Sequence, residues 1–352
     1  MKFDYVIGNP PYQEETAKKE TANGQKTQKN VFQHFQEAVD HVTSVSSVLI
    51  YPGGRWIQQS GKGMQKFGKA QINDPHLSRL YFYSDARRVF KDAEIGDGVS
   101  IVVKEFKKYE GGFEYVFNDK GEEITVELKN PGDKILSLNP RDESIAEKLD
   151  TFIDKENLTS LHDRILSRSL FGVESDFVEK NPGKVRPLAD NNFDPNSEVK
   201  LFTNDKAGKS GRATWYITSK DSITQNADQI GRWQVVVSSA NAAGKKRDNQ
   251  LEIIDDHSAF GRSRVALASF DTKQEAVNFY KYVSSFIIRF AFLLTEDNLT
   301  SLGKRVPDVL DYTANNHMLN WNENINEQLC KLLGLSDAEF KYVKDSVENI
   351  RK

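Results

Sequence analysis

The chain has 352 residues, enough for two domains that each bury a hydrophobic core. Its 48 lysines and arginines and 51 aspartates and glutamates give a net charge of −3, so binding to nucleic acid would require a local basic surface rather than bulk charge. The single cysteine, Cys330, excludes an intrachain disulfide and a cysteine-based metal cluster, and with no signal peptide and no long apolar segment we expect a cytoplasmic protein that does not enter a membrane.

The first expected element is a short apolar strand, Phe3 to Ile7, which ends at Gly8 and leads into Asn9-Pro10-Pro11-Tyr12. An apolar run of this length is typical of a buried parallel strand. Two consecutive prolines restrict the backbone, so the turn after the strand is stiff. Alone, these four residues are also an ordinary turn signal. Because open α/β sheets bind ligands at the carboxyl ends of their strands, the strand and turn together indicate a functional site.

This strand and turn resemble the catalytic motif of the adenine-N6 DNA methyltransferases of type II and type IIG restriction-modification systems. An exocyclic amine is a poor nucleophile because its lone pair is delocalised into the ring. In that family the amide oxygen matching Asn9 and the carbonyl matching Pro10 accept hydrogen bonds from the amine. The ring matching Tyr12 stacks on the flipped base. The resemblance implies methyl transfer from S-adenosyl-L-methionine, with Asn9, Pro10, Pro11 and Tyr12 as the catalytic residues.

The next elements follow the same order. Apolar residues at helical spacing predict a helix from Asn30 to Val45, and Val48 to Tyr51 reads as a second buried strand, which completes a βαβ unit. Leu80–Tyr83 and Gly96–Val103 resemble the terminal strands of the methyltransferase domain. In the family, an aromatic residue near the end of the last strand commonly closes the base pocket. Phe106 is the candidate for base stacking here, and core packing is the alternative role.

The cofactor loop of the family, an aromatic-x-Gly-x-Gly element, precedes the Asn-Pro-Pro-Tyr strand, and here only eight residues precede Asn9. The glycine-rich candidates Tyr51–Gly54, Gly61–Gly63 and Ile95–Gly98 lack the full pattern of strand, spacing and acidic residue. We therefore expect the second half of a methyltransferase domain. Its first strand, left as an edge, would pair with a separate cofactor-binding polypeptide, form a homodimer, or be covered by the chain itself.

The predicted fold class is α/β: a partial Rossmann-like methyltransferase sheet, followed by an α+β target-recognition domain with a helical C-terminal part. The boundaries are residues 1–140 for the catalytic half and 141–352 for recognition. Phe113–Phe117 and Ile124–Leu128 predict a hairpin that extends the first domain, and a helix is expected from Asp142 to Ile153.

The second domain resembles the target-recognition region of the same enzymes. Trp233–Ser238 and Ser263–Phe270 are expected strands, and Thr272 opens a helix that continues to Phe290. In the C-terminal part, Ile325 to Leu333 is an expected helix that stops at Gly334.

Five cations lie in loops of this domain, with Trp215, Tyr216 and Trp233 nearby in the sequence. This mixture suits phosphate contacts and base-edge reading of double-stranded DNA. The alternative is that the charges only keep loops soluble. The candidate DNA-binding residues are Lys209, Arg212, Lys245, Lys246 and Arg247.

Three other functions stay open. Pro307-Asp308 resembles the start of a Pro-Asp nuclease site, but no acidic-x-lysine strand follows at a suitable distance, so a restriction endonuclease is disfavoured. The chain could instead be a DNA-recognition subunit, or an inactive remnant of a restriction-modification enzyme.

Overall fold

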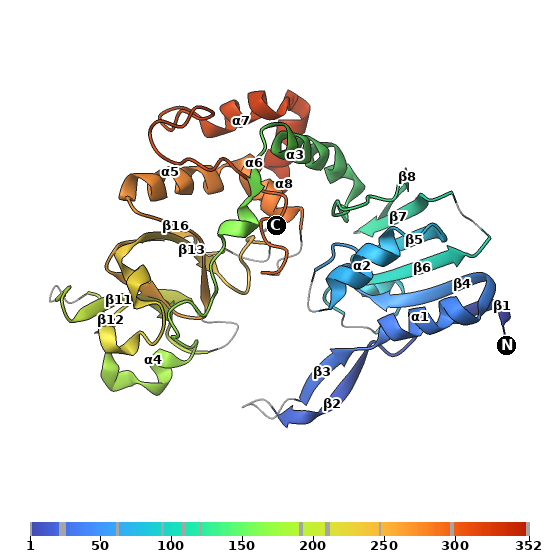
Figure 1. Ribbon diagram of the computed structural model, residues 1–352, viewed down its shortest axis with the longest axis horizontal. Coiled ribbons are helices and arrows are strands. Elements are labelled where there is room, and N and C mark those ends of the chain that lie inside the picture. The colour runs from blue at the N-terminus through green and yellow to red at the C-terminus, as the bar shows by residue number, and fades with distance from the viewer. Residues whose placement is uncertain are drawn as a thin grey trace. The chain divides into compact units, whose positions relative to one another are not determined.

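The computed structural model describes residues 2–20, 26–60, 63–92, 95–107, 110–119, 121–189, 193–207, 212–245, 248–295 and 299–349. The chain forms two compact units, Met1–Glu143 and Ser144–Lys352 (Figure 1). Sheets and helices are mixed in both, so the α/β fold class expected from the sequence is confirmed. No helix in the described ranges is long and apolar enough to cross a membrane.

The first unit is built on a six-stranded sheet with two helices on one face. Its strands and helices are β1 (Phe3–Gly8), β2 (Gln13–Glu20), β3 (Lys26–Asn30), α1 (Phe32–Val42), β4 (Thr43–Pro52), α2 (Met64–Ile72), β5 (Leu77–Tyr83), β6 (Val99–Glu105), β7 (Phe113–Asp119) and β8 (Glu122–Leu128). The sheet order is β1-β4-β6-β5-β7-β8. β1 runs parallel to β4, and α1 connects them, which confirms the βαβ unit. β6 runs antiparallel to both of its neighbours.

The core of this unit lies on the face that α1 and α2 cover (Figure 1). Side chains alternate along each strand, so Leu49 and Tyr51 of β4 are buried while Val48 and Ile50 are only half-buried. The β7–β8 hairpin extends the same core through Tyr115 and its neighbours. The expected hairpin is therefore confirmed as an extension of the main sheet.

β1 differs from expectation in its burial. It is a parallel strand, but Phe3, Tyr5 and Ile7 are 47%, 69% and 81% exposed. The physical reason is position: among the described residues β1 pairs only with β4 and forms one edge of the sheet. The prediction of a buried strand was wrong for this structure, because an apolar run encodes burial only when a neighbouring element covers it.

The β2–β3 hairpin was not predicted. It lies between the Asn9–Tyr12 turn and α1, and it extends outward from the sheet (Figure 1). Its sequence is polar, without the apolar alternation that marks a half-buried strand. Because β3 takes up residues to Asn30, α1 begins at Phe32, and because α1 ends at Val42, β4 is longer than the four-residue apolar run suggested.

The second unit contains a four-stranded sheet, β10-β12-β11-β15, a three-stranded sheet, β14-β13-β16, and a short pair, β17-β9. Its main elements are α3 (Glu143–Lys155), β9 (Thr159–Ser160), α4 (Phe177–Lys180), β10 (Val185–Pro187), β11 (Glu198–Asn204), β12 (Ala213–Ser219), β13 (Trp233–Ser238), β14 (Glu252–Ile254), β15 (Ser258–Phe260), β16 (Arg264–Phe270), α5 (Lys273–Ser284), α6 (Phe286–Leu293), β17 (Pro307–Asp308), α7 (Ile325–Leu333) and α8 (Asp337–Asn349).

Local signals placed several ends of these elements correctly. Thr272 caps α5, and Glu275 completes a reciprocal capping box. Gly334 ends α7 in the left-handed conformation. The long helix expected from Thr272 to Phe290 is instead two helices, because Ser285 is extended and separates α5 from α6. This break was not visible in the periodicity, since both helices continue the apolar pattern.

Candidate functional site

The Asn9–Tyr12 turn follows the carboxyl end of β1, at the end of the sheet where the parallel strand β4 also ends. Asn9 and Pro11 are exposed, and Pro10 and Tyr12 are half-buried. The turn is tied down on its far side, because Val31 N–H, just before α1, donates to the Tyr12 carbonyl at 3.1 Å. The Asn9 amide is therefore presented to solvent on a backbone held at both ends.

Tyr12 has an unusual environment. Its hydroxyl is buried and has no hydrogen-bond partner among the described residues. Burial raises the pKa of this phenol, because the charged phenolate is disfavoured away from water. The residue is thus neutral at ordinary pH, and its ring can act through its apolar face.

The turn that follows β4 lies at the same end of the sheet. Gly53 and Gly98 both have positive φ, at 66° and 80°, and Gly53 N–H donates to the Gly98 carbonyl at 2.8 Å. Arg55 pairs with Asp97 at 2.8 Å, and both side chains are partly exposed. Sequence reasoning missed this cation beside the candidate site. The sequence signal that could have pointed to Arg55 is the pair of glycine turns, which sequence analysis considered only as possible cofactor loops.

These two glycine turns do not fit S-adenosylmethionine. A Cβ atom on Gly53 would approach Asp97 to 2.9 Å, and one on Gly98 would approach the Tyr83 carbonyl to 2.2 Å. The space beside both glycines is already filled by the chain itself, so their role is close backbone packing. Gly63, directly before α2, differs from them, because an added Cβ would meet nothing within 4 Å, and its neighbours Gly61 and Lys62 lie outside the described residues. No group of His, Cys, Asp or Glu among the described residues could hold a metal ion.

Phe106 lies away from the end of the sheet that carries the Asn9–Tyr12 turn. It follows β6, and its N–H donates to the carbonyl of Val45, near the start of β4. Gly8, by contrast, pairs with Leu49, so four residues of β4, roughly 13 Å, separate the two positions along the strand. The Phe106 ring faces His76 at 5.5 Å. Phe106 is therefore not placed to stack on a base at Asn9, because β6 runs in the direction opposite to β1 and β4.

In the second unit, the structure brings two of the predicted cationic loops together. Arg212, just before β12, lies 3.7 Å from Asp248, which lies between β13 and β14. The Gln250 side-chain amide joins the same two segments, since it accepts from Ala213 N–H at 3.1 Å and donates to the Ala213 carbonyl at 3.3 Å. Arg212 is exposed and Lys245 is half-buried. The other candidates, Lys209, Lys246 and Arg247, lie outside the described residues.

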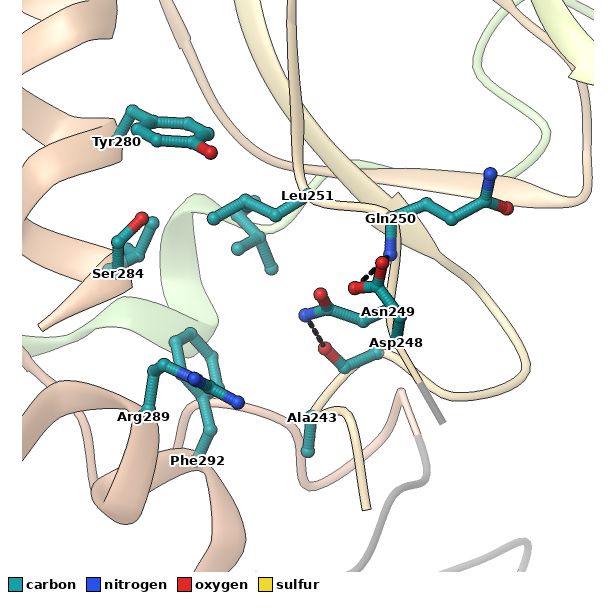
Figure 2. Close-up of a pocket in the computed structure, with 12 residues that line it drawn as sticks. Ala243, Asp248, Asn249, Gln250, Leu251, Tyr280, Ser284, Arg289 and Phe292 are labelled. Atoms are coloured by element: carbon teal, nitrogen blue, oxygen red, sulfur yellow. Dashed lines mark hydrogen bonds between the residues drawn. The ribbon is translucent and has the colours of Figure 1, made fainter. Parts of the chain in front are cut away.

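A cavity of about 280 Å³ lies beneath the connection that carries Lys245. Tyr280 and Arg289 extend into it from α5 and α6, and Asn249 holds its opposite wall by donating to the Ala242 carbonyl at 2.9 Å (Figure 2). The Ser284 hydroxyl is buried there without a described partner. The connection therefore lies over a cavity with polar walls rather than over tightly packed core.

The aromatic residues near these loops separate into two groups. Trp215 lies opposite Phe202, two positions from the end of β11, and their rings are 4.9 Å apart. Trp233, however, begins β13 and pairs with Phe270, at the end of the strand away from Lys245. Trp233 was expected near the loops because of its position in the sequence, and the length of β13 carries it away.

The Pro307-Asp308 pair is structural. Asp308 is 1% exposed, and its carboxylate accepts from Arg164 Nε, from Tyr312 OH at 3.1 Å and from Leu310 N–H at 2.9 Å. Burial and these three donors, one of them a cation, account for Asp308 as a structural carboxylate within the core.

Comparisons with known proteins agree with a restriction-modification methylase at the start of the chain. Residues 1–90, about a quarter of the chain, match the family model of the Eco57I restriction-modification methylase. The matched segment contains β1, the Asn9–Tyr12 turn and β4. A search of curated proteins found no match.

Several solved structures are similar at low identity. The type IIL restriction-modification enzyme MmeI in complex with DNA has a TM-score of 0.41 and 9% identity, covering 99% of this chain and 55% of that chain. The type IIG restriction endonuclease BpuSI has a TM-score of 0.32 and 11% identity, covering 99% and 53%. The methyltransferase subunit of a type I restriction-modification system from Streptococcus thermophilus has a TM-score of 0.25 and 14% identity, covering 35% and 29%. The chain thus spans about half or less of the length of these proteins.

Proposed function

We propose that the chain acts in adenine-N6 methylation of double-stranded DNA within a restriction-modification system. Residues 1–140 would be the second half of the catalytic domain, and residues 141–352 the target-recognition domain. The observation that carries the proposal is the Asn9–Tyr12 turn at the carboxyl end of β1, within the segment that matches a restriction-modification methylase family.

The chemistry follows from the acceptors in this turn. The Asn9 side-chain oxygen and the Pro10 carbonyl would accept hydrogen bonds from the two N–H groups of a flipped adenine amine. These bonds favour the positive charge that develops on nitrogen as it attacks, and they hold the amine in line. The two prolines fix the acceptors before substrate arrives. Tyr12 would stack on the adenine ring, an interaction of about 1–3 kcal/mol.

S-adenosylmethionine is the methyl donor that this family implies, and it would supply an activated methyl group to the adenine nitrogen. The turns at Gly53 and Gly98 do not fit it, because the chain itself fills the space beside them, so no residue of this chain is assigned to its binding. We propose that a separate cofactor-binding polypeptide, or a second copy of the chain, adds to the exposed edge of β1.

The DNA would be read by the second unit. Arg212 and Lys245 lie on two adjacent connections, which the Arg212–Asp248 and Gln250–Ala213 contacts join, and this supports the proposal that both contact phosphates. The Arg212–Asp248 pair is 64% and 50% exposed, and such a pair contributes little. It can therefore exchange for a phosphate at small cost.

A second candidate function is a DNA-recognition subunit without catalysis of its own. The observation in its favour is the lack of fit between the cofactor and the turns at Gly53 and Gly98. The two candidates differ in whether Asn9 matters for methyl transfer.

The deciding experiment uses the assembly purified through a tag on this chain, with radioactive methyl transfer to DNA and detection of N6-methyladenine. Asn9→Ala should abolish transfer while duplex binding is retained. Asn322→Ala, an exposed asparagine in the second unit, is the matched control and should be fully active. Unchanged turnover of Asn9→Ala, or methylation of a base other than adenine, would reject the proposal.

A further inference from the structure

Arg264, the first residue of β16, is a buried arginine that sequence analysis did not single out. It is 2% exposed. One guanidinium nitrogen, Nη1, donates to the Gln250 side-chain oxygen at 3.2 Å, and the other, Nη2, donates to the Asn204 side-chain oxygen at 3.2 Å. The guanidinium also lies 5.8 Å from the centre of the Phe202 ring, within the range of a cation–π contact.

The two acceptors of Arg264 belong to different connections. Asn204 ends β11, directly before the connection to β12. Gln250 lies one residue before the end of the connection from β13 to β14 and has a left-handed backbone, with φ of 51°. The Gln250 amide in turn pairs with the N–H and carbonyl of Ala213, where β12 begins. One guanidinium therefore links the end of the β13–β14 connection to both ends of the β11–β12 connection.

This linkage depends on the shape of the side chain. A guanidinium is planar and presents its donors in a rigid fork, so it fixes two acceptors at a set separation. A lysine keeps the charge but offers a single nitrogen on a flexible stem. Burying a charged group costs stability unless its hydrogen bonds are made. A buried arginine at this position therefore indicates that its hydrogen bonds to Gln250 and Asn204 are needed, because an apolar residue could not make them.

We propose that Arg264 is a positioning residue for DNA binding: it fixes the two connections relative to each other, so that Arg212 and Lys245 contact phosphates of one duplex together. Arg264 does not touch DNA, since it is almost fully buried. This inference rests on the proposed function, because it assigns the purpose of the linkage to the DNA interface of the second unit.

The test is a double-mutant cycle between Arg264→Lys and Arg212→Ala, in the full chain. The probe is a mixed-sequence DNA duplex of about 30 base pairs, and the salt dependence of its affinity is measured for each variant. In the wild-type background, Arg212→Ala should lower affinity at low salt roughly threefold to tenfold. In the Arg264→Lys background, the same change should have less than half of that effect, because Arg212 is no longer held against the duplex.

Two further measurements separate positioning from general destabilisation. Amide hydrogen exchange of residues 204–207, 212–213, 242–245 and 248–250 should speed up in Arg264→Lys while exchange in α5 and α6 is unchanged. Arg232→Lys is the matched control, since Arg232 contacts Ser269 and Asp271 at the other end of the sheet, and its cycle with Arg212→Ala should be additive.

The outcomes are distinguishable. If wild-type protein binds the duplex with no salt dependence, or does not bind it, the DNA interface itself is rejected. If wild-type binding is salt-dependent but the Arg264→Lys and Arg212→Ala effects add, the interface stands and the positioning role of Arg264 is overturned. Unchanged exchange in either connection has the same consequence.

Discussion

The main-chain N–H of Val31 donates to the carbonyl of Tyr12 at 3.1 Å, across the whole β2–β3 hairpin. This bond joins the end of the proposed catalytic turn to the residue before α1. The hairpin therefore begins and ends at the site, and Tyr12 is held from both sides while its ring stays half-buried.

Substitutions of Tyr12 should separate the ring from the hydroxyl. The buried hydroxyl has no described partner, so Tyr12→Phe should keep methyl transfer and the free energy of unfolding near wild-type values. Tyr12→Ala removes a stacking surface of about 1–3 kcal/mol, so single-turnover methylation should fall roughly fivefold to 150-fold. Equal losses in both variants would show that the hydroxyl, rather than the ring, carries the role.

Charge reversal on the second unit should change the salt dependence of DNA binding. Arg212→Glu and Lys245→Glu should each flatten the slope of log affinity against log salt by about one unit for every phosphate that is no longer neutralised. Lys155→Glu, on an exposed lysine at the end of α3, is the control and should leave the slope unchanged. Fluorescence anisotropy at several salt concentrations measures this. Equal slopes for all three variants would exclude these connections as the interface.

The edge of β1 should be an association surface. The opposite edge strand, β8, carries exposed glutamates, whereas β1 exposes Tyr5 and Ile7, and an apolar unpaired edge invites another strand. Replacing Tyr5 and Ile7 with lysine should abolish co-purification of a partner polypeptide or self-association, measured by light scattering. Lysines at Thr125 and Glu127 of β8 are the matched control.

The same preparations test the cofactor. The isolated chain should bind S-adenosylmethionine more weakly than micromolar, that is, with less than about 8 kcal/mol, because the chain itself fills the space beside Gly53 and Gly98. Calorimetry that detects micromolar binding by this chain alone would contradict this expectation and would place a cofactor site on the chain itself.

Lys104 should be essential to the stability of the first unit. It is fully buried, and its ammonium pairs with Asp40 at 2.8 Å and with Asp74 at 2.6 Å. Lys104→Met leaves two carboxylates without their cation, so the free energy of unfolding should fall by about 3 kcal/mol. Denaturant titration of the chain measures the loss, and Lys69→Met, on an exposed lysine of α2, should cost far less.

The Lys104 cluster also predicts an acid dependence. Burial alone would raise the pKa of Asp74, but the hydrogen bond and charge of Lys104, with donors from His76, outweigh it and lower the pKa. A carboxyl with a lowered folded-state pKa stabilises the fold above its ordinary pKa of 3.8, and this contribution is lost as pH falls through the lower folded value. In Lys104→Met this part of the acid dependence should disappear, and an unchanged pH profile would contradict the assignment.

Sequence reasoning succeeded where the signal is local. The β7–β8 hairpin and the capping box at Thr272 each depend on a few neighbouring residues, whose backbone preferences act without the rest of the fold. The parallel β1–α1–β4 unit was predicted from two apolar runs and the helical spacing between them. The catalytic hypothesis came from the short segment Phe3 to Tyr12, and a family model matches residues 1–90, which contain this segment.

Other features required the three-dimensional arrangement, because they depend on which distant segments meet. The exposure of Ile7, the distance of Phe106 from Asn9 and the separation of Trp233 from Lys245 follow from strand order, strand direction and strand length. The Gln250–Ala213 and Arg264–Asn204 bonds join residues 37 and 60 positions apart. No periodicity in a single sequence records such pairs, since a hydrogen bond between remote side chains is set by the packing of the sheets that carry them.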